Sequence, residues 1–299
     1  MNSPHMIQYD GNCHCGRYRF ELSLTKKIGS AKSCTCRLCA KKAYLWLAPS
    51  EGSFRVTRDD GELSEYDSGV LLDKVATHFC VVGEHRAGPL KGIFLVNVRA
   101  IQGVNPFDIE YVNKPVQSIL IGLKLLTMAN MYRPETTAVH SLRDQLATEP
   151  STDTGPPYTF SCHCGGVKAT LNVALKGQEA KEDNCSRCVR TGYIGVYPTK
   201  DEVDIPNSSW ENSFAYAGTY GGGAHHCKTC GVFVFSEVAG PPISVFDSFA
   251  PERREHMLKV YHRNMGLQPL NVRCVEGFDV GLPDIRRSDE GTGGYTVGS

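Results

Sequence analysis

The residues of this chain best suited to chemistry are cysteines, which fall into two matched sets. The first set has the spacings Cys-x-Cys, Cys-x-Cys-x-x-Cys and a later cysteine, and it comprises Cys13, Cys15, Cys34, Cys36, Cys39 and Cys80. The second set has a Cys-x-Cys pair and two Cys-x-x-Cys pairs, and it comprises Cys162, Cys164, Cys185, Cys188, Cys227 and Cys230. Such spacings let one short loop present two thiolates to one metal ion. The pattern therefore predicts metal binding.

The two sets are copies of one unit, and each copy has lost one ligand position. Asp183 in the second copy occupies the position of Cys34 in the first, because each follows its Cys-x-Cys pair by 19 positions. Gly83 in the first copy stands where the second copy has Cys230. We therefore interpret the chain as a duplicated unit whose copies have diverged separately.

In the second copy, two widely separated cysteine pairs predict a structural zinc site. A Cys-x-Cys pair near the start and a Cys-x-x-Cys pair far downstream can bring four thiolates to one tetrahedral zinc ion. The ligands of this four-cysteine site would be Cys162, Cys164, Cys227 and Cys230. Four thiolates fill the coordination sphere, so we expect the site to join parts of a sheet and to perform no reaction.

The first copy retains only part of the corresponding site. Its remaining ligands would be Cys13, Cys15 and Cys80. Two interpretations stay open. Either a nearby side chain completes the set, with His78, His85 and Glu84 as candidates, or packing has replaced the metal.

The Cys-x-Cys-x-x-Cys cluster of the first copy suits a reactive metal site. This three-cysteine site consists of Cys34, Cys36 and Cys39. Three ligands from one short turn cover one side of a metal and leave its fourth position open. Three thiolates give a zinc unit about one net negative charge, which activates water poorly but suits the exchange of a ligand with an incoming thiol. We therefore expect thiol chemistry at these catalytic candidates.

The corresponding cluster of the second copy consists of Asp183, Cys185 and Cys188. A hard oxygen in place of a thiolate weakens the binding of zinc, so we expect a weak site or none. Decay after duplication is one interpretation. The other is that Asp183 acts as a general base in chemistry without a metal.

Short strands are expected to position these clusters. Residues 18–24 and 167–173 alternate apolar and polar side chains after each Cys-x-Cys pair, and residues 43–48 and 193–197 follow each second cluster. Glycine-rich turns separate the segments. The expected fold is mainly β.

The repeat and the length of 299 residues predict two tandem β domains. Their expected ranges are 1–114 and 158–283, and an Asn-Val-Arg sequence followed by glycine recurs near the end of each. Apolar residues between Val116 and Leu126 predict one helix in the segment 115–157, which ends in a Pro-rich linker. Residues 284–299 are expected to form a flexible tail.

Composition excludes several classes of partner. Lys+Arg 32 balances Asp+Glu 32, so the net charge favours neither nucleic acid nor an anionic membrane surface. No apolar run approaches the roughly 18–20 residues of a membrane helix, and no secretory signal is visible. Thirteen cysteines are too sparse for a disulfide scaffold, so we expect a reducing, cytoplasmic location. The oligomeric state stays open.

The order of the motifs resembles a known family. The run Gly-x-Cys-His-Cys-Gly, then Cys-x-Cys-x-x-Cys, then a Cys-x-x-Cys-Gly position and a final Asn-Val-Arg is similar to the glutathione-dependent formaldehyde-activating enzymes, which include the centromere protein V-like domains. The resemblance covers nearly the whole chain as two tandem copies. It implies a β-tent of small sheets around a structural zinc. It also implies a second zinc where a glutathione thiol or its adduct is handled.

The resemblance implies a carbon–sulfur lyase with zinc as cofactor and glutathione as a co-substrate. It also implies a small-molecule substrate, the adduct of a thiol. By position, the four-cysteine site matches the structural zinc ligands and the three-cysteine site matches the catalytic ones. Tyr44 and Trp46, just after Cys39, are candidates for contact with substrate, although aromatic residues in a strand usually belong to a core. The alternatives are a zinc-containing binding module without chemistry and a metal-free acid/base enzyme.

Overall fold

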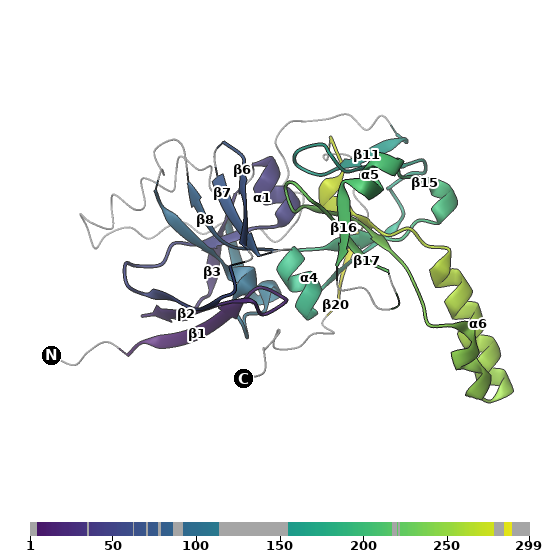
Figure 1. The fold of residues 1–299 in the computed structure, drawn as a ribbon, viewed down its shortest axis with the longest axis horizontal. Coiled ribbons are helices and arrows are strands. Elements are labelled where there is room, and N and C mark those ends of the chain that lie inside the picture. The colour runs from purple at the N-terminus through teal and green to yellow at the C-terminus, as the bar shows by residue number, and fades with distance from the viewer. Residues whose placement is uncertain are drawn as a thin grey trace. The chain divides into compact units, whose positions relative to one another are not determined.

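The computed structural model describes residues 5–34, 36–61, 63–69, 71–76, 79–85, 92–113, 155–216, 220, 222–277 and 284–288. Strands dominate these ranges, so the expected mainly β fold is confirmed (Figure 1). The helix predicted within residues 115–157 falls on a segment of which only residues 155–157 are described, so that prediction lies outside the described residues.

The first copy contains two sheets. The smaller consists of β1 (Ile7–Asn12), β2 (Tyr18–Leu24) and β5 (Phe54–Asp59), in the antiparallel order β1-β2-β5. The larger consists of β3 (Ser30–Ser33), β4 (Leu45–Leu47), β6 (Leu63–Asp67), β7 (Leu71–Ala76), β8 (Phe79–His85), β9 (Phe94–Asn97) and β10 (Glu110–Asn113). Its order is β10-β3-β4-β9-β8-β7-β6, and the pair of β10 with β3 is parallel.

The second copy repeats this plan. Its smaller sheet consists of β11 (Tyr158–Ser161), β12 (Lys168–Leu171) and β15 (Val203–Asp204), in the order β11-β12-β15. Its larger sheet consists of β13 (Glu179–Asp183), β14 (Ile194–Val196), β16 (Ser213–Tyr216), β17 (Gly223–Cys227), β18 (Phe233–Glu237), β19 (Leu270–Asn271) and β20 (Asp284–Ser288). Its order is β16-β17-β18-β19-β14-β13-β20. Read from the opposite end, this order matches that of the first copy strand for strand, so the duplication extends from the cysteines to the topology.

Residues 284–288 differ from the sequence-based expectation. We expected them in a flexible tail, but they form β20 next to β13. The backbone N–H of Asn184 donates to the carbonyl of Ser288 at 3.3 Å, and Arg287 pairs with Glu182 at 3.3 Å. The glycines beyond residue 288 indicated a flexible tail, so the sequence alone did not predict this short strand.

The compact units of the chain do not follow its sequence order. One unit comprises residues 1–150, 182–193 and 287–299, and the other comprises residues 151–181 and 194–286. The expected domains 1–114 and 158–283 were contiguous, whereas the segment 182–193 of the second copy belongs to the first unit. This segment contains the Cys185 and Cys188 pair.

A short helix begins within the second cysteine cluster of each copy. These two helices are α1 (Arg37–Lys42) and α4 (Ser186–Thr191). The remaining described helices are α5 (Asn207–Glu211), α6 (Pro251–Met265) and the 3-10 turns η2 (Val98–Ala100), η3 (Pro106–Asp108), η4 (Lys200–Glu202), η5 (Ile243–Ser248) and η6 (Val272–Cys274). Cys36 and Cys185 are the N-cap residues of α1 and α4. Both helices end on a left-handed residue, Ala43 with φ 52° and Gly192 with φ 60°.

Apolar side chains from the strands form the core of each copy. In β2, burial alternates along the strand as its sequence predicted, and Phe20 and Leu22 are fully buried. In the second copy, the largest buried side chains include Phe160 and Phe235. The repeated Asn-Val-Arg sequences form η2 and η6, where Asn97 and Asn271 accept a hydrogen bond from the arginine N–H two residues later. The core thus supports the cysteine-bearing loops.

Candidate metal centres

The four-cysteine site is assembled in the second copy. Cys162 and Cys164 follow β11, Cys227 ends β17, and Cys230 lies in the turn before β18. Their four sulfurs lie within 4.8 Å of one another. The sulfur of Cys164 is 3.5 Å from that of Cys162 and 3.5 Å from that of Cys227. The predicted grouping is therefore present, and only Cys164 is exposed.

Backbone and ring contacts hold these loops in place. The N–H of Val167 donates to the sulfur of Cys162 at 3.3 Å, and the N–H of Gly231 donates to the carbonyl of Cys227 at 2.9 Å. Gly231 has φ 69°, a left-handed conformation that glycine adopts without strain. A ring nitrogen of His226 lies 3.2 Å from the Gly231 carbonyl, and the ring stacks on Phe233.

The donor set fits zinc. Zinc–sulfur bonds of about 2.3 Å in a tetrahedron separate the sulfurs by about 3.8 Å, which agrees with the observed spacing. Because the four thiols lie close together, the ionisation of one thiol disfavours the ionisation of its neighbours. Hydrogen bonds from Cys162 and Cys227 lower the pKa of Cys230. Hydrogen bonds to Cys162 and Cys230, together with burial, raise the pKa of Cys227. A divalent cation at the centre would allow all four to ionise.

The three-cysteine site is assembled in the first copy. Cys34 follows β3, Cys36 caps α1, and Cys39 lies on the first turn of α1. Their sulfurs also lie within 4.8 Å of one another. Cys34 and Cys39 are buried, and Cys36 is the most exposed of the three. The group could therefore hold a metal with one side toward solvent.

One thiolate is favoured within this site. Hydrogen bonds from Cys34 and then Cys39 lower the pKa of Cys36 to about 3, with burial opposing and the N–H groups of Cys39 and Leu38 assisting. The pKa of Cys34 is raised to about 11, first by its hydrogen bond to Cys36. Hydrogen bonds to Cys34 and Cys36, and then burial, raise the pKa of Cys39. Negative charge therefore concentrates on the thiol nearest to solvent.

Tyr44 and Trp46 pack behind this site. Each is only 3% exposed, and their rings lie 4.6 Å apart between centroids. The indole N–H of Trp46 donates to the sulfur of Cys39 at 3.4 Å. Trp46 thus positions a cysteine of the site, and its contact with substrate stays a prediction.

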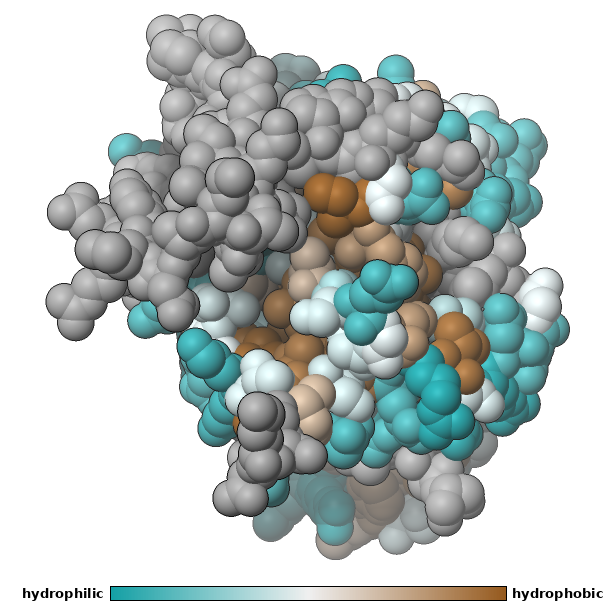
Figure 2. All heavy atoms as spheres, turned by 90° about the vertical axis from the view of Figure 1, so that its left-hand side faces the viewer, coloured by the Kyte–Doolittle hydropathy of each residue, from teal (hydrophilic) through white to brown (hydrophobic). Residues whose placement is uncertain are grey.

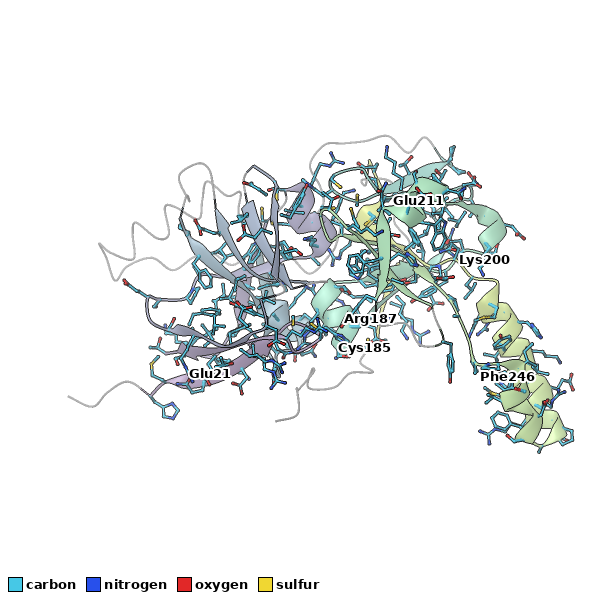
Figure 3. All side chains as sticks on the ribbon, viewed as in Figure 1. Glu21, Cys185, Arg187, Lys200, Glu211 and Phe246 are labelled. Carbon is cyan, nitrogen blue, oxygen red and sulfur yellow. The ribbon has the colours of Figure 1, made fainter. Side chains whose placement is uncertain are left out.

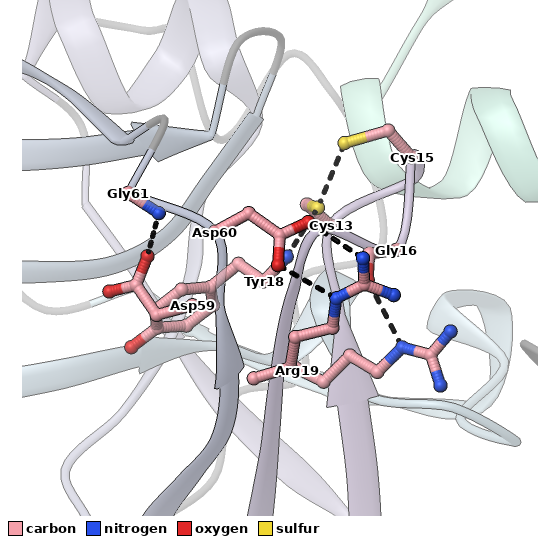
Figure 4. Close-up of polar contacts among 9 residues, drawn as sticks. Cys13, Cys15, Gly16, Tyr18, Arg19, Asp59, Asp60 and Gly61 are labelled. Carbon is pink, nitrogen blue, oxygen red and sulfur yellow. Dashed lines mark hydrogen bonds and ion pairs between the residues drawn. The ribbon is translucent and has the colours of Figure 1, made fainter.

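In the corresponding site of the first copy, the structure describes the side chains of Cys13 and Cys15. The sulfurs of Cys13 and Cys15 lie 3.1 Å apart, and the N–H of Tyr18 donates to Cys13 at 3.3 Å (Figure 4). The hydrogen bond with Cys15, and then burial, raise the pKa of Cys13. His78 and the side chains of Cys80 and His85 lie outside the described residues, so completion of the site by these groups stays a prediction.

The expected alignment of Gly83 with Cys230 is wrong. In the matching strand orders β8 corresponds to β18, and Gly83 lies buried inside β8, where it pairs with Leu95 of β9, whereas Cys230 lies in the turn before β18. A methyl carbon placed on Gly83 would lie 3.1 Å from Cη2 of Trp46 and 3.4 Å from Cδ1 of Leu71. Gly83 therefore leaves room for the Trp46 ring in the core of the first copy.

In the second copy, the cluster that corresponds to the three-cysteine site has two cysteines and Asp183. Oδ1 of Asp183 accepts the N–H of Cys185 at 2.7 Å, which closes a local turn. Among the described residues, no group of three metal-ligand atoms includes Asp183, Cys185 or Cys188. The hydrogen bond from Cys188 lowers the pKa of Cys185 to about 6, and the same bond raises the pKa of Cys188.

Two buried arginines were missed in the sequence. Arg99 donates from Nε to the carbonyl of Ala43 at 2.8 Å and from Nη1 to that of Val189 at 3.2 Å. Arg190 donates from Nε to the carbonyl of Asn12 at 3.3 Å. Within the first unit, these bonds link the ends of α1 and α4 to the Cys-x-Cys turn. The repeated Asn-Val-Arg sequence was the one signal that could have revealed Arg99.

An apolar groove lies on the first copy. Phe54, Val56, Val82, Gly83 and Phe94 are among its lining residues, and Val56 and Phe94 are 43% and 37% exposed. Figure 2 shows apolar surface interspersed with polar residues on this side of the molecule. Among the described residues, no helix has the length and apolar character needed to span a bilayer.

Comparison with known proteins does not assign a family. No protein-family profile matches the chain, and no curated protein matches it. Among solved structures, a crystal structure of a Rhodobacter sphaeroides protein, a Northeast Structural Genomics target, matches 34% of this chain and 99% of that chain. The sequence identity is 24% and the TM-score is 0.28, a likeness too low to carry a conclusion about fold or activity.

Proposed function

We propose that the chain is a zinc-dependent enzyme that makes or breaks a carbon–sulfur bond in the adduct of a thiol, such as glutathione, with an electrophilic metabolite. The observation that carries the proposal is the three-cysteine site, whose sulfurs lie within 4.8 Å of one another with Cys36 toward solvent. The reaction class comes from the resemblance of the cysteine order to the glutathione-dependent formaldehyde-activating enzymes. The four-cysteine site supports the proposal because its donor set suits a purely structural zinc.

The chain's own residues prepare this site for thiol chemistry. A zinc ion held by three thiolates would supply a soft cation with a fourth position that accepts a sulfur ligand. Cys39 is held by the indole N–H of Trp46, and Cys34 is buried at the end of β3. The sulfurs therefore keep their relative positions, and the exposed side of Cys36 is where a substrate sulfur would approach.

Electrostatics favours the transfer of a sulfur at such a position. In one direction a thiolate sulfur donates its electron pair to an electrophilic carbon, and in the other the sulfur leaves carbon with that pair. Both directions require stabilisation of negative charge on the substrate sulfur. The burial of Cys34 and Cys39 excludes water from the inner side of the site.

A metal-free acid/base enzyme built on Asp183 is less well supported. Its Oδ1 accepts the N–H of Cys185 at 2.7 Å, so this carboxylate oxygen already serves the turn that begins α4. A general base must reach the proton that it removes. This hydrogen bond therefore favours a structural role for Asp183.

Substitution of Cys36 by serine tests the proposal. We expect Cys36→Ser to lose about one zinc ion per chain and at least about 100-fold in turnover of glutathione adducts of small carbonyl compounds. The matched control is Cys274→Ser, since Cys274 is buried in the second copy, outside both metal-ligand groups, and its side chain donates to the carbonyl of Phe233. This control should retain zinc and turnover.

Two results would reject the enzyme proposal. Cys36→Ser with unchanged turnover would remove the three-cysteine site from the reaction. Wild-type protein that holds zinc at both sites but turns over no adduct in the panel would instead favour a binding module without chemistry.

A further inference from the structure

The pair of Cys185 and Cys188 has a geometry that the metal sites do not use. Cys185 is half-buried at the N-cap of α4, and Cys188 is buried one turn later. The two thiols hydrogen-bond to each other. Among the described residues, neither thiol belongs to a group of three candidate metal ligands. The pair is therefore a dithiol with one accessible and one protected sulfur.

The exchange of one residue separates this pair from its counterpart in the first copy. There, Cys34 adds a third thiol that hydrogen-bonds with Cys36 and Cys39. In the second copy, Asp183 stands at that position and its Oδ1 accepts the Cys185 N–H. A soft three-sulfur metal site has thus become a two-sulfur site with an engaged hard oxygen, which holds zinc poorly.

We propose that Cys185 and Cys188 form a redox-active dithiol that reduces the disulfide of a small thiol and closes to an intramolecular disulfide. Residues three apart at the start of a helix lie on one face, close enough for a disulfide bond. Cys185 is the attacking residue because it is the more exposed of the two. Cys188 is the resolving residue because it is buried and lies three residues after Cys185, on the same face of the first turn of α4.

The reaction balances with a small disulfide as the oxidant. The Cys185 thiolate attacks one sulfur of the disulfide, forms a mixed disulfide and releases one small thiolate. Cys188 then loses its proton, attacks the Cys185 sulfur and displaces the second small thiolate. Two cysteine thiols are oxidised, one small disulfide is reduced, and the two protons reside on the two released thiols.

The surroundings of the pair hold α4 in place. Arg190 is buried and donates from Nε to the carbonyl of Asn12 at 3.3 Å and from Nη1 to that of Ser186 at 3.4 Å. Charges of both signs act on the pair: that of Asp183 on both thiols, and that of Arg187, which lies next to Cys185 on α4 (Figure 3), on Cys188. Partial exposure distinguishes reactive cysteines from inert ones, which are buried among apolar groups.

Peptide mass mapping after redox equilibration tests the proposal. The zinc-containing chain is equilibrated with mixtures of reduced and oxidised glutathione, quenched with acid, denatured and alkylated. We expect Cys185 and Cys188 to lose alkylation together, with one midpoint and the loss of two hydrogen atoms from the connecting peptide. Cys274 serves as the internal control, because it is buried without a neighbouring cysteine in sequence, and it should stay fully alkylated.

Single substitutions separate the two roles. Cys188→Ser should stop at a stable mixed disulfide, with one glutathione on Cys185, because the resolving thiol is gone. Cys185→Ser should take up no glutathione at Cys188, because that sulfur is buried.

The proposal is overturned if both cysteines stay fully alkylated at every glutathione ratio. It is also overturned if the two single variants take up glutathione equally, or if Cys185 pairs with Cys15 in place of Cys188. These outcomes do not depend on the carbon–sulfur reaction, because that reaction is assigned to the three-cysteine site.

Discussion

The two copies of the repeated unit keep opposite halves of its cysteine chemistry. The second copy keeps four sulfurs that surround one point, and three of them are buried. The first copy keeps a three-sulfur cluster whose most exposed member carries a lowered pKa. Burial and full coordination suit a structural role, whereas partial exposure and an open position suit reaction. We infer that the two copies serve different roles on the same strand order.

Two residues outside the cysteine sets support the clusters locally. Gly83 leaves room for Trp46, whose indole N–H donates to the Cys39 sulfur. Oδ1 of Asp183 accepts the N–H of Cys185 in the turn before α4. In the first copy, core packing thus supports the three-cysteine site. In the second copy, a carboxylate stands in the position of the third thiol, and two cysteines remain.

The largest expected difference between the copies concerns their structural sites. Cys230→Ser should release zinc and lower the melting temperature by more than about 10 °C, because a structural zinc contributes many kcal/mol to folding. Cys15→Ser, in the incomplete site of the first copy, should change the melting temperature much less. Elemental analysis and thermal unfolding of both variants measure this contrast. Equal effects of the two substitutions would contradict it.

A smaller effect is expected at Gly83, which packs against Trp46. Gly83→Ala should destabilise the protein by about 1–3 kcal/mol, since the added methyl would crowd the Trp46 ring in a packed core. Gly29→Ala is the matched control, because no atom lies within 4 Å of a methyl placed there. Chemical denaturation of both variants measures the difference. If Gly83→Ala is neutral, Trp46 does not depend on the glycine.

The smallest contrast concerns the pH dependence of the two clusters. The pKa of Cys36 is lowered to about 3 and that of Cys185 to about 6, so each keeps its negative charge as the pH falls until its own pKa is reached. After mild chelation, alkylation of Cys36 should stay constant from about pH 8 to about pH 5, whereas that of Cys185 should fall by half near pH 6. Mass mapping of timed alkylation measures both rates. The reverse order of pH dependence would contradict the assignment.

The sequence could predict what depends on short spacings. The grouping of Cys162, Cys164, Cys227 and Cys230 followed from loops that present paired thiolates, and the alternation in residues 18–24 followed from the two-residue period of a strand. The mainly β fold followed from the same signals. Each of these features is encoded within a few consecutive residues or in a repeat of them.

Contacts between distant segments could not be predicted in this way. Nothing local to Gly83 shows that Trp46 packs on it, and nothing local to Arg99 shows that it binds the carbonyl of Val189. The pairing of β20 with β13 likewise joins segments about a hundred residues apart, and loop closure of that length leaves no local pattern. The polar contacts that support the site therefore emerged only from the structure.

Zinc stoichiometry tests the central claim that the copies have specialised through single ligand changes. Elemental analysis should compare the wild type with the reciprocal variants Cys34→Asp and Asp183→Cys. We expect about two zinc ions per wild-type chain, about one in Cys34→Asp and about three in Asp183→Cys. The same zinc content in all three proteins would contradict the account.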